Sequence, residues 1–135
     1  MLDAFNNRRS QINDAGDRIV EHLETSSNFK GNLTQKLEPD LVDESYTKIK
    51  ESYDSINGGF GTMPKFPQIP LLEFLLRYAD SRNSDEALEM VTHTLDTMGS
   101  GGIHDQLQGG FHRYSTDAKW IMPHFEKMLY DNALI

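Results

Sequence analysis

Apolar side chains recur along this chain at the spacing of one helix face, not at the alternation of a strand. The first such stretch runs from Leu2 to about Glu24, and a second begins at Pro39, which suits the first turn of a helix. Residues 25–38 between them are polar and non-periodic, which predicts a linker. The stripe of the first helix comprises Phe5, Ile12, Ala15, Ile19 and Leu23, and that of the second comprises Val42, Tyr46, Ile49, Tyr53 and Ile56.

Two further helices follow a glycine-rich turn at 57–61 and a proline-rich loop. The third helix is predicted from Ile69 or Leu71 to Asp80 and is apolar nearly all round, so we expect it to be covered on most sides. Asn83 or Ser84 caps the fourth helix. The stripe of the fourth helix consists of Leu88, Val91, Leu95 and Met98, and the glycines that end it are Gly99, Gly101 and Gly102.

The last helix is predicted to begin near Pro123 and to be still running at Ile135. No segment alternates with β-branched residues, so we expect no sheet beyond a short hairpin within 101–122. A faint internal repeat supports an array of helical hairpins: Gly58-Gly59-Phe60 and then Pro64-Lys65-Phe66 recur as Gly109-Gly110-Phe111 and then Pro123-His124-Phe125. The predicted fold class is all-α, with four or five helices.

Composition excludes several kinds of function. The 135 residues suffice for one domain, and 13 basic against 21 acidic side chains give a formal net charge of -8. Both halves of the chain are acidic, which disfavours nucleic acids and anionic membrane surfaces as partners. The absence of cysteine excludes disulfides, thiolate metal sites and thiol redox chemistry from these residues. No apolar run has the length of a transmembrane helix, and we expect a cytoplasmic protein.

Candidate chemistry is concentrated between residues 109 and 132. The loop contributes His112, Arg113, Tyr114, Asp117 and Trp120, which are types that surface loops rarely gather without a binding role. Helical spacing would place His124, Lys127 and Asp131 on one face of the last helix, with Phe125, Met128, Leu129 and Asn132 on the buried side. Flat rings, carboxylates and a guanidinium suit a polar ring-shaped ligand. The competing interpretation is that this face of the last helix is simply charged and solvated, and that its histidine caps the helix or fills space.

No cofactor is expected. The glycine clusters are interpreted as turns, because no Gly-Lys-Ser/Thr follows them and no dinucleotide fingerprint is complete. A metal site built from His104, Asp105, His112 and His124 is a weaker alternative, because these residues lack the spacing of known zinc motifs.

From about residue 57 onward, the chain resembles the family of spermatogenesis-associated, thioredoxin-domain-containing proteins and their bacterial YyaL-like relatives. The residues that carry the resemblance are Gly58-Gly59-Phe60-Gly61, Pro64-Lys65-Phe66-Pro67, Gly101 through Leu107, Gly109 through Ser115, and Pro123 through Asn132. The chain departs from the pattern at Gln108, where the family generally has a third glycine. Residues 1–56 match more loosely.

The resemblance implies a full-length protein with an N-terminal thioredoxin-like domain and an (α/α)6 toroid. That toroid is similar to N-acylglucosamine 2-epimerases and six-hairpin glycosidases. Residues 1–38 would be the connector helix and linker after the thioredoxin-like domain. Residues 39–135 would be the first helical hairpins of a truncated toroid. We expect such a piece to be inactive alone and to self-associate as a dimer or higher oligomer, because the helices that would cover its third helix are missing.

By analogy with related toroids, the chain would belong to a carbohydrate-active or sugar-binding domain. The expected catalytic residues are His112, Asp117, His124, Glu126 and Asp131, and the expected substrate-binding residues are Lys65, Arg113, Tyr114, Trp120 and Lys127. Among them, Trp120 or Tyr114 would stack on a sugar ring. The alternative is a non-catalytic scaffold or binding module that serves the thioredoxin-like domain of the same full-length chain.

Overall fold

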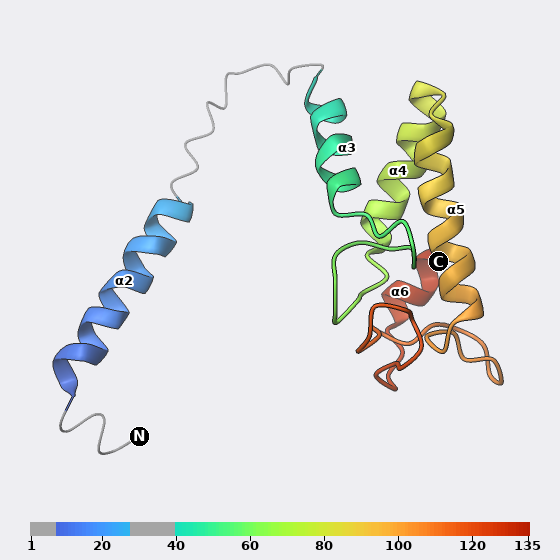
Figure 1. Cartoon of the computed structure of the whole chain (residues 1–135). Helices are drawn as coiled ribbons and strands as arrows, with labels where there is room; N and C mark the ends of the chain where they lie inside the picture. The colour runs from blue at the N-terminus through green and yellow to red at the C-terminus, as the bar shows by residue number, and fades with distance from the viewer. Residues whose placement is uncertain (1–7, 28–39) are drawn as a thin grey trace. The chain divides into compact units, whose positions relative to one another are not determined.

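The computed structural model describes residues 8–27 and 40–135. The chain divides into two compact units, residues 1–38 and residues 39–135. The described residues contain five helices and no strand, which confirms the all-α class (Figure 1). None of these helices has the length and apolar character needed to cross a membrane.

The first unit contains helix α2, Arg9–Ser27. The predicted start of this helix and the stripe residue Phe5 lie outside the described residues, as do residues 28–38 of the predicted linker. The helix includes residues 25–27, the first three residues of the predicted linker. Its apolar side chains Ile12, Ile19 and Leu23 are 44%, 61% and 59% exposed, so the expected stripe exists but is not buried.

The second unit begins with α3, Leu41–Glu51, which is shorter than its predicted stripe. Ser52 caps its C-terminus by donating its backbone N–H to the Ile49 carbonyl, and the chain then turns away. Tyr53 leaves the helix to form an isolated antiparallel bridge with Phe60. The prediction that Tyr53 and Ile56 continue the helix was therefore wrong, and Ile56 is 83% exposed.

Helices α4, Ile69–Arg82, and α5, Asp85–Ser100, form a tight hairpin. Between them Asn83 takes a left-handed φ of 50° as the C-cap of α4. Ser84 is the N-cap of α5, and its hydroxyl accepts a hydrogen bond from the Ala87 N–H at 3.3 Å. Helix α5 continues through Gly99, beyond its predicted end, and stops where Gly101 becomes extended.

Helix α6, Leu129–Leu134, begins six residues later than predicted from Pro123. The segment before it is extended because its backbone pairs with the loop: His124 N–H donates to the Tyr114 carbonyl, and the Glu126 carbonyl accepts from Arg113 N–H. His124 and Lys127 therefore do not share a helix face with Asp131, and that prediction was wrong. The expected burial of Phe125 and Leu129 was also wrong, since they are 83% and 86% exposed.

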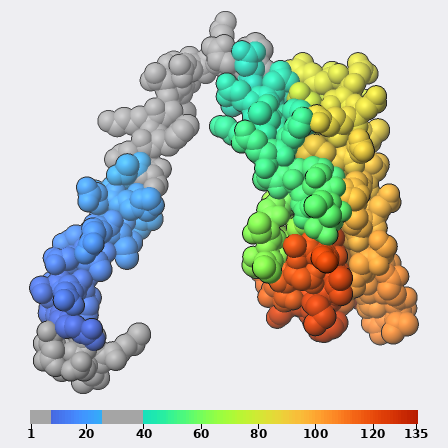
Figure 2. Space-filling model, in the orientation of Figure 1, coloured from blue at the N-terminus to red at the C-terminus, as the bar shows by residue number. Residues whose placement is uncertain are grey.

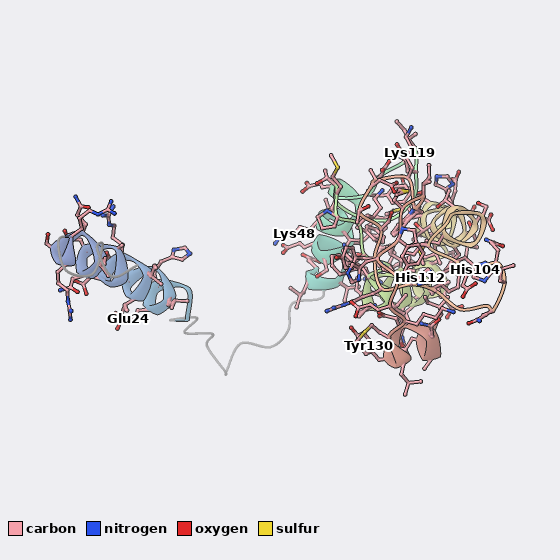
Figure 3. The ribbon with its side chains drawn as sticks, turned by 90° about the horizontal axis from the view of Figure 1, so that it is seen from below. Glu24, Lys48, His104, His112, Lys119 and Tyr130 are labelled. Carbon is pink, nitrogen blue, oxygen red and sulfur yellow. The ribbon has the colours of Figure 1, made fainter. Side chains whose placement is uncertain are left out.

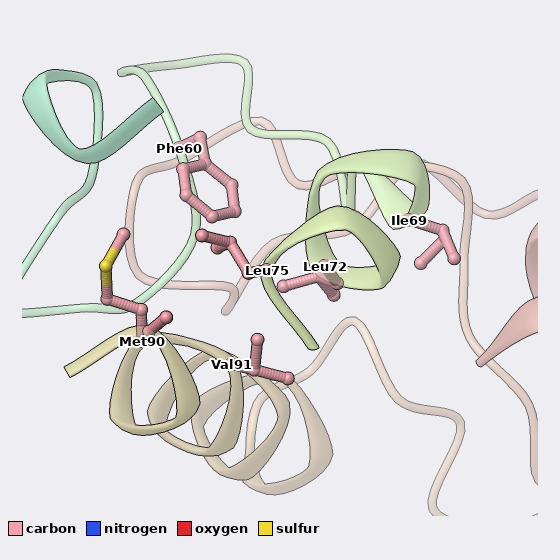
Figure 4. Close-up of a cluster of buried hydrophobic side chains, with 7 residues drawn as sticks. Phe60, Ile69, Leu72, Leu75, Met90 and Val91 are labelled. Carbon is pink, nitrogen blue, oxygen red and sulfur yellow. The ribbon is translucent and has the colours of Figure 1, made fainter. Parts of the chain in front are cut away.

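The main apolar core lies between α4 and α5. Figure 4 shows side chains from both helices meeting there, with Phe60 entering from the preceding loop. The buried members of the cluster are Phe60, Ile69, Leu72, Leu75, Ala87, Met90 and Val91. Helix α3 adds a partly buried layer, in which the Tyr46 ring stacks on Tyr78 with centroids 4.2 Å apart. We expected α4 to be covered on most sides. Leu75 is fully buried, but Leu76 is 45% exposed, so one side of the helix is open.

A glycine turn closed by a buried lysine follows α3. The Asp54 Oδ1 atom accepts hydrogen bonds of 3.0 Å from the backbone N–H groups two and three residues further on. Gly58 and Gly59 take φ values of 68° and 78°, a region that glycine adopts without steric cost. Lys65 Nζ closes the turn by donating to Asp54 Oδ2 at 2.6 Å and to the Gly58 carbonyl at 2.8 Å. We call residues 54–65 the first lysine-clamped turn.

The same turn recurs after α5. Asp105 Oδ1 accepts two 3.0 Å hydrogen bonds from the same two relative positions, and Gly109 and Gly110 take φ values of 77° and 81°. Lys127 Nζ donates to Asp105 Oδ2 at 2.6 Å and to the Gly109 carbonyl at 2.8 Å. We call residues 105–127 the second lysine-clamped turn. The sequence comparison paired Lys65 with His124, but the structure shows Lys127 in the equivalent role.

The two turns lie against each other at one end of the second unit (Figure 2). Lys65 and Ser115 exchange both backbone hydrogen bonds at 2.8 Å. The indole of Trp120 covers the first turn so closely that a Cβ atom on Gly59 would collide with it. As a result, the Lys65 side chain is fully buried, whereas the Lys127 side chain is 32% exposed.

The two clamps provide a matched pair for measuring the effect of burial. We expect Lys65→Met to lower the free energy of unfolding by about 3–5 kcal/mol, because water cannot reach the fully buried position of the lost ammonium to satisfy Asp54 Oδ2 and the Gly58 carbonyl. We expect Lys127→Met to cost about 1 kcal/mol, because water replaces the lost partner at the more exposed clamp. Urea unfolding at pH 7 measures both, and equal losses would contradict the assigned difference in burial.

The first clamp also predicts a pH dependence. Desolvation tends to raise the pKa of Asp54, but the hydrogen bonds from Lys65 and Asn57 overcome it and hold the pKa well below the ordinary 3.8. A depressed carboxyl pKa contributes stability above the unfolded-state value, and this contribution is lost as the pH falls through the folded-state value. The stability difference between wild type and Asp54→Asn should therefore be full at pH 7 and shrink below about pH 4.

Candidate functional site

Trp120, predicted to stack on a ligand, is part of the core. It is fully buried with Met98 and Ile103, and its Nε1 donates to the Asn57 carbonyl at 2.9 Å. Its backbone φ of 64° lies in the left-handed region, which is unusual for a non-glycine residue. The expectation that Trp120 stacks on a sugar ring requires an exposed ring face, and the described structure buries this ring completely.

The Asp117 carboxylate binds backbone N–H groups of the loop that contains Trp120. Its carboxylate accepts backbone N–H hydrogen bonds from Lys119 and Met122, both at 2.6 Å, and a longer one from Ile121 at 3.3 Å. Ser115 Oγ adds a fourth bond at 3.0 Å. Desolvation tends to raise the pKa of Asp117, but these backbone bonds overcome it and lower the pKa, which keeps the group ionised. This carboxylate is therefore an acceptor engaged by its own loop.

Lys65 and Lys127, predicted to bind substrate, are engaged in the two clamped turns. Lys65 Nζ also lies 5.3 Å from the centroid of the Trp120 ring, within range of a cation–π contact. Four of the ten predicted site residues, Lys65, Asp117, Trp120 and Lys127, thus have hydrogen bonds that hold the loops together.

Three rings form a ladder beside the first lysine-clamped turn, and the outer two are exposed. Phe66 stacks on Tyr114 with centroids 4.8 Å apart, and Tyr114 stacks on His124 at 5.0 Å with an interplanar angle of 8°. The extended pairing of residues 113–116 with residues 123–126 sets this spacing, because it places Tyr114 and His124 side by side. Phe66 was not among the predicted site residues, although it belongs to the repeated Pro-x-Phe motif.

An ion pair flanks the ladder. Arg113 Nη1 donates to Glu126 Oε1 at 2.9 Å, and His124 Nδ1 lies 3.4 Å from the same oxygen. The side chains of Arg113, Glu126 and His124 are 42%, 40% and 53% exposed, so a ligand from solvent can reach them. We call the set Phe66, Arg113, Tyr114, His124 and Glu126 the ladder site.

Arg113 acts on two carboxyl groups in different environments. Its hydrogen bond and its charge lower the pKa of Glu126, and the same contact raises the pKa of the guanidinium. Asp131, in the first turn of α6, has a raised pKa because burial outweighs the attraction of Arg113. The pKa of Glu126 therefore lies below the ordinary value for its side chain, and that of Asp131 lies above its own. Opposed pKa shifts of this kind are found in acid/base pairs.

His112 lies apart from this ion pair. Its ring meets Phe125 edge-on at 5.3 Å, and its Nδ1 is buried without a hydrogen-bond partner in the described part of the chain. Figure 3 looks onto the loop-bearing end of the second unit, where His112 and His104 are labelled. Among residues 8–27 and 40–135, no group of three or more metal-ligating side chains is arranged to hold an ion, including the weaker histidine alternative.

Part of the chain is similar to several known proteins. Spermatogenesis-associated protein 20 of Homo sapiens and that of Rattus norvegicus are each 48% identical to it over 92 residues, covering 65% of this chain and 12% of those proteins. The uncharacterized protein B0495.5 of Caenorhabditis elegans is also 48% identical over 92 residues, covering 13% of that protein. No protein-family profile matches the chain.

These similarities support the resemblance to the spermatogenesis-associated family that the glycine and proline motifs indicated. The chain spans only about an eighth of the length of these relatives. The toroid, the thioredoxin-like domain and the activity of the full-length protein therefore remain proposals.

The opposed pKa directions can be checked by following the side-chain carboxyl carbons by NMR during a pH titration. We expect the midpoint of Glu126 below 4.5 and that of Asp131 above 3.8. Arg113→Gln should raise both midpoints, because it removes a positive charge that favours both ionised forms. Glu86 on α5, whose pKa is lowered by Lys50 and Tyr46, is the control whose midpoint should not respond. A change in only one of the two site carboxyls would contradict the shared role of Arg113.

Proposed function

We propose that the ladder site binds a sugar or a similar polar ring, and that the chain belongs to a carbohydrate-active or sugar-binding protein. The observation that carries this proposal is the exposed ring ladder with an ion pair beside it. Sugars present apolar C–H faces and hydroxyl edges, which suit stacked rings and charged hydrogen-bonding groups respectively.

The ladder suggests which ring would receive the ligand. Tyr114 is stacked on both faces, by Phe66 and by His124, so its faces are already covered. We therefore assign ligand stacking to the outer rings of the ladder, and hydroxyl binding to Arg113 and Glu126. This assignment replaces Trp120, which is buried, as the expected stacking residue.

The two carboxyl groups whose pKa values Arg113 affects support a catalytic form of this proposal. Glu126, with its lowered pKa, would serve as the ionised base or acceptor, and Asp131, with its raised pKa, would serve as the acid. His124, near Glu126 Oε1, would hold a hydroxyl or carry a proton. Both carboxyl groups belong to the set predicted from the sequence.

A non-catalytic scaffold for a thioredoxin-like domain is the alternative. It is favoured by the engagement of Lys65, Asp117, Trp120 and Lys127 in loop structure, since these are polar or aromatic groups that a binding site would leave free. Under this alternative, the ladder stabilises the loops and has no ligand.

Calorimetric titration of the chain with glucose, N-acetylglucosamine and maltose tests the proposal. We expect Glu126→Gln to weaken the binding of whichever sugar gives heat by about tenfold, the effect of one charged hydrogen bond. The control is Glu73→Gln, which breaks the comparable surface pair with Arg77 on α4. Absence of heat with all three sugars, or equal affinity in both variants, would contradict sugar binding at the ladder site.

A further inference from the structure

A cavity lies between α3 and α5, and it shares no residue with the ladder site. Its volume is about 560 Å³, within the range of small-molecule sites. The lining residues are Lys50, Tyr53, Ser55, Glu86, Glu89, Met90 and His93. The spacing of the α5 members places them on one helix face, opposite the C-terminal end of α3.

One acidic group in this cavity is already neutralised. Glu86 receives hydrogen bonds from the Tyr46 hydroxyl at 2.6 Å and from Lys50 Nζ at 2.9 Å, and Lys50 also pairs with its other oxygen at 2.7 Å. Burial, followed by the hydrogen bond to Glu86, raises the pKa of Tyr46 to about 12, so the phenol remains a donor. Lys50 and Glu86 therefore cancel in charge and fasten α3 to α5 at one end of the cavity.

Three accessible acceptors remain. The Glu89 carboxylate has no ion-pair or hydrogen-bond partner among the described residues, and neither do the hydroxyls of Tyr53 and Ser55. Tyr53 and Glu89 line the same cavity, and burial, followed by the charge of Glu89, raises the pKa of Tyr53. The uncompensated charge of the cavity is therefore one negative charge beside two neutral hydroxyls.

The remaining lining is apolar or aromatic. Met90 is 3% exposed and belongs to the core, and the Tyr53 ring meets His93 edge-on at 6.5 Å. The His93 Nε2 atom is buried, with no hydrogen-bond partner among residues 40–135. Buried polar atoms usually have partners, so this nitrogen is an exception in the cavity lining.

We propose that this cavity is a binding site for a primary alkylammonium group. Such a group carries one positive charge and three N–H donors, which match the Glu89 carboxylate and the Tyr53 and Ser55 hydroxyls. Its methylene stem would lie along Met90 and the Tyr53 ring, where the ring face also attracts the cation. The net charge of -8 on the chain favours cations and disfavours anionic ligands.

Titration of the chain with n-butylamine, followed by NMR shifts of the Tyr53 and His93 signals, tests this site. We expect saturable binding that Glu89→Gln weakens at least tenfold and that Tyr53→Phe weakens severalfold. Glu73→Gln, which removes one negative charge from the surface of α4, should bind like wild type. Equal binding by wild type and the Glu89→Gln variant would overturn the proposal, as would the absence of any saturable shift.

Tetramethylammonium separates recognition of the N–H donors from simple attraction of a cation. It has the same charge but no donor, so we expect it to bind at least tenfold more weakly than n-butylamine. Equal binding of the two cations would overturn the three-acceptor assignment. The ladder-site variant Glu126→Gln should bind n-butylamine like wild type, and a loss there would contradict the separate location of the cavity. The outcome is independent of the sugar titration, because neither site contributes a residue to the other.

Discussion

The fully buried ammonium of Lys65 is the constraint on which the second unit depends. A charge without access to water is tolerated only when its hydrogen-bonding capacity is met. Asp54 supplies the counter-charge at 2.6 Å, the Gly58 carbonyl supplies a second acceptor, and the Trp120 ring covers the group from the second loop. The turn can aim that carbonyl inward because glycine accepts positive φ. The loops after α3 and α5 are thereby joined around one cation.

The second lysine-clamped turn repeats this arrangement with a more solvent-exposed lysine. Lys127 makes the same two bonds as Lys65, at the same distances, yet it remains one-third exposed. Asn132 then ties α6 to this turn, accepting from the Phe111 N–H at 2.6 Å and donating to its carbonyl at 2.9 Å. The repeating unit is therefore a helix, a lysine-clamped turn and a second helix, and only the first copy is covered by the other.

The clamps also determine which polar residues are available for chemistry. The cations and the carboxylates that close the two turns are committed to them, and Asp117 is committed to its own loop. What remains at the surface is the ring ladder with Arg113 and Glu126, and the separate cavity containing Glu89. Hydrogen bonds within these loops hold the ladder residues in place, which would lower the conformational entropy lost in binding the proposed ligand.

The sequence by itself determined the helical class and most helix positions, because apolar periodicity and capping residues such as Ser84 act locally. It also identified the repeated glycine-aromatic turns. Only the tertiary structure decided the start of α6, because the backbone of residues 123–126 pairs with a distant segment instead of continuing a helix. It also decided that Trp120 and Lys65 are buried, that Tyr114 is half-buried and that His124 is exposed. Residue type records the chemistry of a side chain, whereas the packing of two loops against each other decides whether water reaches it.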